Sequence, residues 1–217
     1  MLFRSLGDRE AALDHARQGL ELADATGFLR GLARAGMGRA LLMHGHGRQA
    51  VAFLEEALAI VRELRVGLID EGWQLATLAE AYLLAGEVVR ARETADLAVS
   101  VARRRGTRLH EIIAHLARAH VLLATDSATD APAIAATLDD AAALVDATAA
   151  RGWAPPIHAA RARLARLRGD EATCARELEL ARRLCIEMGA PARAEQLTWE
   201  LGSSAESTSG ISSTSRT

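Results

Sequence analysis

The stretch that decides the fold is residues 78–98, LAEAYLLAGEVVRARETADLA, in which one glycine separates two segments rich in alanine and leucine. Alanine, leucine, glutamate and arginine are strong helix formers, so both segments predict helices. Gly86 between them permits a tight turn. In the second segment Ala91, Ala95 and Ala98 are spaced by four and three residues, which places them on one helical face. Small residues on that face allow two helices to approach closely.

The same pattern recurs along the chain, with a turn residue before each second helix. These residues are Gly7, Gly45, Gly86, Pro132 and Gly169, in steps of 38, 41, 46 and 37 residues. Small or apolar residues follow each of them at offsets of five, nine and twelve. A second set of glycines predicts left-handed helix C-caps at Gly27, Gly67, Gly106, Gly152 and Gly189. Because one helix pair cannot bury its apolar face alone, the pairs are expected to stack.

This periodicity predicts an all-α, right-handed solenoid of about five antiparallel helix pairs with a C-terminal capping helix. The expected helices are 1–6, 8–26, 29–44, 48–66, 69–85, 87–105, 108–124, 133–151, 155–168, 170–188 and 191–201. Residues 125–131 predict an enlarged turn. Trp153 is expected to fill a gap between repeats, and Trp199 to anchor the capping helix. The expected domain is 1–201, followed by a disordered Ser/Thr-rich tail at 202–217.

Composition narrows the function classes. Half of the residues are hydrophobic but only 3% are aromatic, so the expected core consists of alanine, leucine and valine. A net charge of -2 gives no general attraction to nucleic acid or to an anionic membrane. No apolar run is long enough to span a bilayer and no apolar leader opens the chain, so we expect a cytoplasmic location. The absence of Lys and Asn favours a GC-rich bacterial source.

The opening stretch resembles a known family. Residues 78–86 resemble the first helix of a tetratricopeptide (TPR) repeat, with Leu78, Ala79 and Tyr82 at that family's large, small and aromatic positions. The three spaced alanines that follow match its second-helix positions. The resemblance implies an α-solenoid that binds a protein or peptide segment on its concave surface, without catalysis and without a cofactor.

A narrower resemblance covers most of the chain. Residues 69–124 look like the C-terminal repeat region of large bacterial signalling proteins, and residues 168–197 are similar to the end of the cyclase-linked kind. Those proteins join a nucleotide cyclase or a LuxR/MalT-type DNA-binding domain to an AAA-like ATPase and then to such repeats. The resemblance implies a regulatory module from a longer signalling protein. The short segment before Gly7 also leads us to expect an open N-terminal face. Such a face indicates either a truncated gene product or a surface for self-association, for example in a homodimer.

Clusters of titratable residues do not match a metal or catalytic motif. His110, His115 and His120 step by five, so they do not share a helical face, and HEIIAH is one residue too long for the zinc-binding HExxH. His44 and His46 lack an evident third ligand. The chain contains neither a P-loop nor a nucleophile elbow. We therefore expect no metal and no enzymatic activity.

Arginines and cysteines receive structural interpretations as well. The run at residues 103–105 falls in the last turn of a predicted helix, where cations interact favourably with the helix dipole. No aromatic residues interleave with the arginines to stack on bases, so nucleic acid is not an expected partner. Cys174 and Cys185 lie three turns apart on one predicted helix, too far for a disulfide. Two buried free thiols in a reducing compartment are expected.

The predicted binding surface is the concave groove lined by the first helix of each pair. Repeat alignment places an apolar floor there, with charged residues above it. The predicted members are Leu32, Arg39, Leu42, Met43, Trp73, Glu80, Leu83, Ile112, His115 and Arg163. Such a surface suits a peptide or helix of mixed charge. Two alternatives remain: several of these residues are buried between helices, or the groove senses a small molecule and transmits a curvature change to a partner domain.

Overall fold

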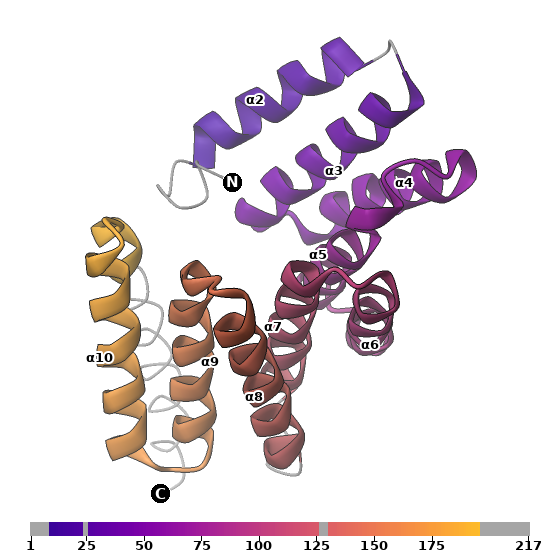
Figure 1. Cartoon of the computed structure of the whole chain (residues 1–217). Coiled ribbons are helices and arrows are strands. Elements are labelled where there is room, and N and C mark those ends of the chain that lie inside the picture. The colour runs from indigo at the N-terminus through magenta and orange to yellow at the C-terminus, as the bar shows by residue number, and fades with distance from the viewer. Residues whose placement is uncertain (1–8, 24–25, 126–129, 196–217) are drawn as a thin grey trace, which may run out of the picture.

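The computed structural model describes residues 9–23, 26–125 and 130–195, and its regular elements there are all helices (Figure 1). In chain order they are α2 (Arg9–Leu22), α3 (Gly27–Met43), α4 (Gly47–Leu64), η2 (Leu68–Asp70), α5 (Glu71–Leu84), α6 (Val88–Arg105), α7 (Arg108–Ala124), α8 (Ala131–Thr148), η4 (Arg151–Trp153), α9 (Ala154–Leu167) and α10 (Glu171–Glu187). Residues 191–195 are also helical. The predicted all-α helix pairs are confirmed. The expected helix 1–6, Trp199 and the tail at 202–217 lie outside the described residues.

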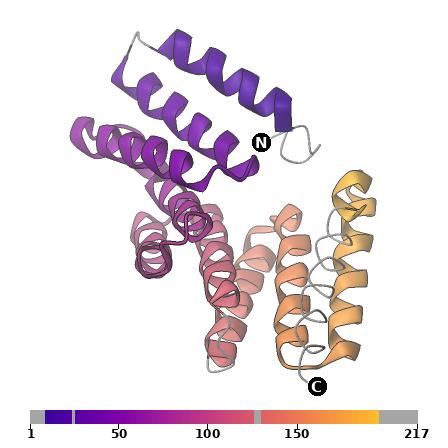
Figure 2. The ribbon, with the colours of Figure 1, turned by 180° about the vertical axis from the view of Figure 1, so that it is seen from behind.

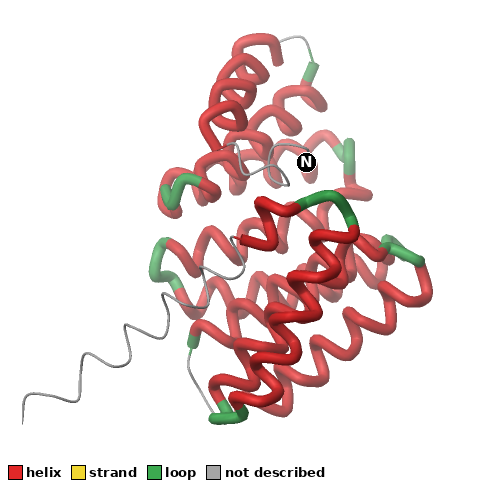
Figure 3. The backbone as a smooth tube through the Cα atoms, turned by 90° about the vertical axis from the view of Figure 1, so that its left-hand side faces the viewer, coloured by secondary structure: helices red, strands yellow, loops and turns green. Residues whose placement is uncertain are grey.

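The helix pairs stack along a curved path, with α2 and α3 at one end and α9 and α10 at the other (Figures 1 and 2). Successive first helices contact each other: α3 contacts α5, α5 contacts α7, and α7 contacts α9. Each intervening second helix contacts the first helix on either side of it, as α4 does with α3 and α5. We call the first helices the inner layer and the second helices the outer layer. Turns connect the helices along the edges of the array (Figure 3).

The buried stripe of each second helix follows the offsets in the sequence. Ala50, Leu54 and Ala57 in α4 are completely buried, and the corresponding alanines of α6 are at most 1% exposed. A Cβ atom added at Gly38 in α3 would lie 2.5 Å from Leu54 Cγ. Small residues therefore set the close approach of α3 to α4. None of the described helices is both long enough and apolar enough to cross a membrane.

The turn residues were predicted only in part. Gly86 has the left-handed backbone expected of a hinge, with φ of 84°, and Gly106 caps α6 with φ of 67°. The predicted C-caps at Gly27, Gly67 and Gly152 are wrong. Helix α4 is capped by Arg65, which has φ of 53°, and Gly67 instead precedes η2. Gly27 is the first residue of α3, where the side chain of Thr26 caps the helix, and Gly152 lies inside η4. The C-cap of α8 is instead Ala149, three residues before Gly152, and it has φ of 53°.

Helix α7 lies between two clusters of buried apolar residues. One of its stripes, including Ile113 and Val121, joins the cluster formed with α3 to α6, and another, including Ile112 and Leu116, joins the cluster formed with α8 and α9. Trp153, half-buried after α8, packs against both clusters. This position confirms that Trp153 fills a gap between repeats. Because both clusters include residues of α7, most α7 side chains are buried, and few reach the surface of the array.

Candidate functional site

Side chains from three successive inner helices contact one another. The guanidinium carbon of Arg39 in α3 lies 4.6 Å from the centroid of the Trp73 ring in α5. Trp73 in turn stacks on His110 of α7, with ring centroids 6.0 Å apart and 27° between the planes. Nδ1 of His110 lies 3.0 Å from the carbonyl oxygen of Ile69. A cation over an indole face is electrostatically favourable, so the Arg39–Trp73–His110 row ties the inner layer together.

Beside this row the inner helices carry both charge and exposed apolar surface. Nδ1 of His120 in α7 lies 3.2 Å from the Glu80 carboxylate in α5, and both side chains are about a third exposed. Large apolar side chains remain accessible near the starts of α3, α5 and α7: Leu32 is 47% exposed, Ile69 62% and Leu109 43%. A surface of this kind can bind apolar side chains and charged groups of either sign together.

The structure places most of the predicted groove residues at accessible or half-buried positions on the inner helices. Leu32 and Arg163 are exposed, whereas the half-buried members are Arg39, Leu42, Met43, Trp73, Glu80 and Leu83. Among these the structure brings Arg39 into contact with Trp73 across two repeats. Arg163 lies further along the array, on α9.

Two predicted groove residues are not accessible. Ile112 is completely buried and packs in the cluster built with α8 and α9, and His115 is only 2% exposed. Helix α7 is contacted by α5, α6, α8 and α9, so its register relative to the groove depends on packing from several sides. The α7 side chains that contact inner-layer neighbours are instead His110 and His120. For Ile112 and His115, burial between helices is therefore the correct interpretation.

Sequence reasoning missed a set of ion pairs that join successive helix pairs. Glu71, in the first turn of α5, is 7% exposed and accepts hydrogen bonds from Arg62 of α4 at 2.9 Å and from Arg105 of α6 at 3.0 Å. Burial by itself would raise the pKa of Glu71, but the hydrogen bonds from Arg105 and Arg62 hold that pKa below its usual value. Glu111, in the first turn of α7, accepts from Arg103 of α6 at 2.8 Å.

These pairs explain part of the arginine run at the end of α6. Arg103 and Arg105 are held by carboxylates of the neighbouring inner helices, in agreement with a structural role at the helix C-terminus. The signal in the sequence was an acidic residue in the first turn of an inner helix, downstream of an arginine in the last turn of the preceding helix. The second partner of Glu71, Arg105, comes from a later helix, which no local pattern reveals.

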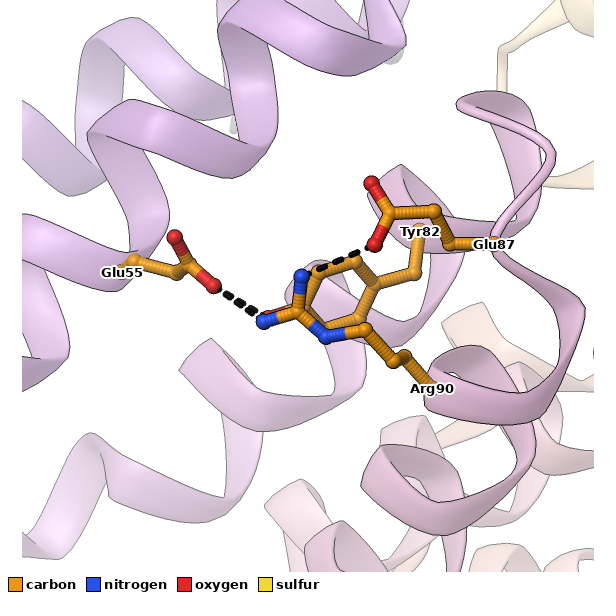
Figure 4. Close-up of polar contacts among 4 residues, drawn as sticks. All are labelled: Glu55, Tyr82, Glu87 and Arg90. Atoms are coloured by element: carbon orange, nitrogen blue, oxygen red, sulfur yellow. Dashed lines mark hydrogen bonds and ion pairs between the residues drawn. The ribbon is translucent and has the colours of Figure 1, made fainter.

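Tyr82, at the aromatic position of the repeat, joins α4, α5 and α6 (Figure 4). Its hydroxyl donates to Glu55 Oε1 at 2.5 Å, and Arg90 lies over its ring at 4.1 Å from the centroid. Arg90 also donates to Glu55 and to Glu87, at 2.5 and 2.8 Å. Burial, followed by the hydrogen bond to Glu55, raises the pKa of Tyr82 to about 12. Tyr82 is 3% exposed, so it stabilises the junction rather than lining a groove.

Residues that could hold a metal do not converge. Among the residues that the structure describes, no group of three or more His, Cys, Asp or Glu side chains is arranged to bind an ion. The rings of His44 and His46 stack with centroids 6.2 Å apart. Cys174 and Cys185 are buried and unbridged.

The fold is similar to that of solved repeat proteins. No protein-family model matches the sequence, and no curated protein matches it. A variant of a Podosopora anserina kinesin-light-chain-like protein, with nearly identical TPR-like repeats, aligns with a TM-score of 0.58 and 17% identity over 86% of this chain and 91% of that chain. A second crystal structure of that protein aligns with a TM-score of 0.56, the same identity and the same coverage. This chain therefore has the fold of a TPR-like helical-repeat solenoid.

Proposed function

We propose that this chain is a protein-interaction scaffold that binds a segment of another protein along the inner helices α3, α5 and α7, without catalysis. The observation that carries the proposal is the Arg39–Trp73–His110 row. Tryptophan and arginine are the side chains most enriched in binding hot spots, and here they form one continuous contact across three repeats. TPR-like architecture supports it, because an array of stacked helix pairs creates an extended concave surface.

The inner surface also indicates the chemistry of the segment. Exposed Leu32 and Ile69 favour an apolar anchor side chain beside Trp73. Arg39 favours a nearby acidic group, and Glu80 favours a basic one. An amphipathic helix or an extended peptide with charges of both signs would meet these requirements.

The test is selection of peptides from a random display library on the purified chain, followed by affinity measurements with variants. Trp73→Ala removes the central ring, and Leu32→Ser changes an exposed residue that leaves the core intact. Loss of a hot spot costs about 2 kcal/mol or more, so each variant should bind the selected peptide at least roughly thirtyfold more weakly. Leu97→Ser, on the outer helix α6 and 41% exposed, is the matched control and should bind normally. Peptides that bind both inner-surface variants as tightly as the natural chain would contradict the proposal.

We further propose that the chain is a regulatory part of a longer bacterial signalling ATPase or nucleotide cyclase, located in the cytoplasm. The similarity of residues 69–124 and 168–197 to the repeats of such proteins supports this origin. Two buried, unbridged cysteines fit a reducing compartment. An antibody raised against the purified chain should detect a much larger protein in extracts of the source cells. A band at the size expected of 217 residues would contradict the proposal.

Self-association at the N-terminal end is a second proposal for partners. Helix α2 exposes Leu22 to 79%, and α3 exposes Phe28 and Leu29 to 45% and 40%. A contiguous exposed apolar patch can mark an interaction site, and a two-fold dimer pairs the same patch on both copies. Light scattering coupled to size-exclusion chromatography should show a dimer that dissociates when Leu22 is changed to Glu. A monomer at the highest soluble concentration would exclude this interface.

A small-molecule sensor is the alternative function, and one observation favours it. The structure contains a cavity lined by a buried histidine between α6, α7 and α8, although it is not in the inner groove. Ligand binding there could change how successive pairs stack, because the cavity walls belong to two neighbouring repeats.

A further inference from the structure

His110, in the first turn of α7, contacts three different kinds of group. Its Nδ1 lies 3.0 Å from the carbonyl oxygen of Ile69, and its Nε2 lies 3.6 Å from Oδ1 of Asp70. Its ring stacks on Trp73, which is also in contact with Arg39. His110 therefore links the Arg39–Trp73–His110 row to a carboxylate.

These contacts decide which nitrogen carries the hydrogen when the ring is neutral. A carbonyl oxygen only accepts, so Nδ1 of His110 carries the hydrogen and donates it to Ile69. Nε2 then presents a lone pair to the carboxylate of Asp70, and the two cannot form a hydrogen bond. Protonation places a hydrogen on Nε2 and turns the same contact into an ion pair.

The charges around the His110 ring come from several elements. Asp70 faces it from η2, and Arg39 of α3 lies across the Trp73 ring. Helices α8 and α9 contact α7 through the apolar cluster that contains Ile112. Charged residues at the end of α6 are paired with carboxylates of the inner helices, Arg103 with Glu111 and Arg105 with Glu71. The N-terminus of α7 disfavours a cation, and the Asp70 carboxylate opposes that effect.

A change of pH therefore changes the charge of the row. Histidine is the side chain that ordinarily gains or loses a proton between pH 5 and 8. The side chains of His110 and Asp70 are 14% and 38% exposed, so solvent protons reach the pair. In the neutral state the Asp70 carboxylate repels an acidic group that approaches Arg39. Protonation of His110 compensates that negative charge and adds a cation beside the Trp73 ring.

We propose that the inner surface binds an acidic segment of its partner in a pH-dependent manner, with His110 as the proton acceptor and Asp70 as the charge that it neutralises. This inference rests on the proposed binding of a protein segment along α3, α5 and α7. Arg39 attracts the acidic group at either pH, and acidification removes the repulsion from Asp70. The segment should thus bind more tightly as the pH falls below 7.

The test selects peptides from a random display library on the purified chain at pH 5.5 and measures their affinities at pH 5.5 and 7.5. Aspartate and glutamate stay ionised over this range, since they ordinarily titrate near pH 4. The selected peptides should contain one of them and bind roughly three- to fivefold more tightly at pH 5.5, the gain from one partly exposed charge interaction.

Two variants test the assignment to this pair. His110→Gln should lose most of the difference between the two pH values. Asp70→Asn removes the repelling carboxylate, so at pH 7.5 it should bind as tightly as the natural chain does at pH 5.5. Asp70 makes no side-chain bond that caps α5, so this substitution should keep the helix intact, and circular dichroism verifies the helix content of both variants.

Other histidine–carboxylate pairs provide the controls. His158 lies 2.7 Å from Glu177 between α9 and α10, away from the row, so His158→Gln should keep the pH dependence of the natural chain. His120 lies beside Glu80 on the inner surface, and His120→Gln measures the separate contribution of that pair.

Three results would overturn the proposal. Peptides that bind the natural chain equally at both pH values would leave the scaffold function intact but exclude its control by pH. An equal pH dependence in the natural chain and in His110→Gln would assign the effect to another group. A failure to select any binding peptide at either pH would remove the scaffold function, and the pH dependence with it.

Discussion

Two glycines two residues apart in α3 give a direct test of how closely the inner and outer helices pack. A Cβ atom at Gly36 would have no contact within 4 Å, whereas one at Gly38 would lie 2.5 Å from Leu54 Cγ, 2.9 Å from Leu54 Cδ2 and 3.3 Å from the Ala50 carbonyl oxygen. Leu54 is completely buried, so it has little freedom to move aside. The same substitution to alanine should therefore have opposite effects at the two positions.

The magnitudes follow from two contributions. Alanine is favoured over glycine inside a helix by roughly 0.5–1 kcal/mol, so Gly36→Ala should stabilise the chain by about that amount. Gly38→Ala gains the same helix propensity but adds a methyl group to a filled space, which typically costs about 1–3 kcal/mol. The difference between the two variants should thus be about 1–3 kcal/mol, or several degrees in Tm for a chain of this length.

Urea unfolding monitored by circular dichroism would measure both variants against the natural chain. The midpoints can be compared only if the free energy of unfolding falls with urea concentration at the same slope in all three chains. This condition must be checked because repeat arrays can depart from two-state unfolding. In the Leu54→Ala background, which removes the clashing atoms, Gly38→Ala should lose its penalty. If Gly38→Ala raises the midpoint as much as Gly36→Ala does, α3 and α4 are not as close as the structure shows and the reasoning is refuted.

Three further predictions concern titrating groups. Tyr82 is the chain's single tyrosine, so the ultraviolet absorbance of tyrosinate should titrate near pH 12 in the folded state and near 10 in urea. Glu55→Gln should lower the midpoint of the folded state. A folded midpoint near 10 would contradict the Tyr82–Glu55 bond. Glu71 has a lowered pKa, so its contribution to stability is present above the ordinary pKa of 4.5 and is lost as the pH falls below it. Glu71→Gln should make the urea midpoint less dependent on pH in that acidic range. An unchanged pH dependence would argue against the two ion pairs. His115 also has a lowered pKa, so the free energy of unfolding should decline as the pH falls below about 6.5, the ordinary histidine value. His115→Leu should remove that decline. If the decline persists in the variant, another group causes it.

The sequence predicted the helices well because helix formation depends on local periodicity. Helix α7 begins and ends at the residues expected, 108 and 124, and the buried alanines of α6 occupy the expected face. Helix ends were less predictable: α8 ends on Ala149, since a non-glycine residue adopts the left-handed conformation there. A glycine nearby in the sequence was not sufficient to locate that cap.

The exposure of the predicted groove residues depends on how regular the repeats are. Arg39 and Trp73 come from pairs with similar spacing, and their side chains are in contact. Ile112 and His115 come from the pair with the long 46-residue step, where α7 packs against four helices and its rotation is set by all of them. The ion-pair partners of Glu71 and the burial of His115 likewise depend on contacts between helices, which local patterns do not encode.

The position of Trp153 has a mechanical consequence. If the array is pulled by its ends, every junction between repeats carries the same force, and rupture begins at the junction that resists least. Trp153 packs against the apolar clusters on both sides of α7, so it links the two halves of the array mechanically. In single-molecule stretching, Trp153→Ala should therefore split one extension event into two, with the segment after α8 unravelling at lower force.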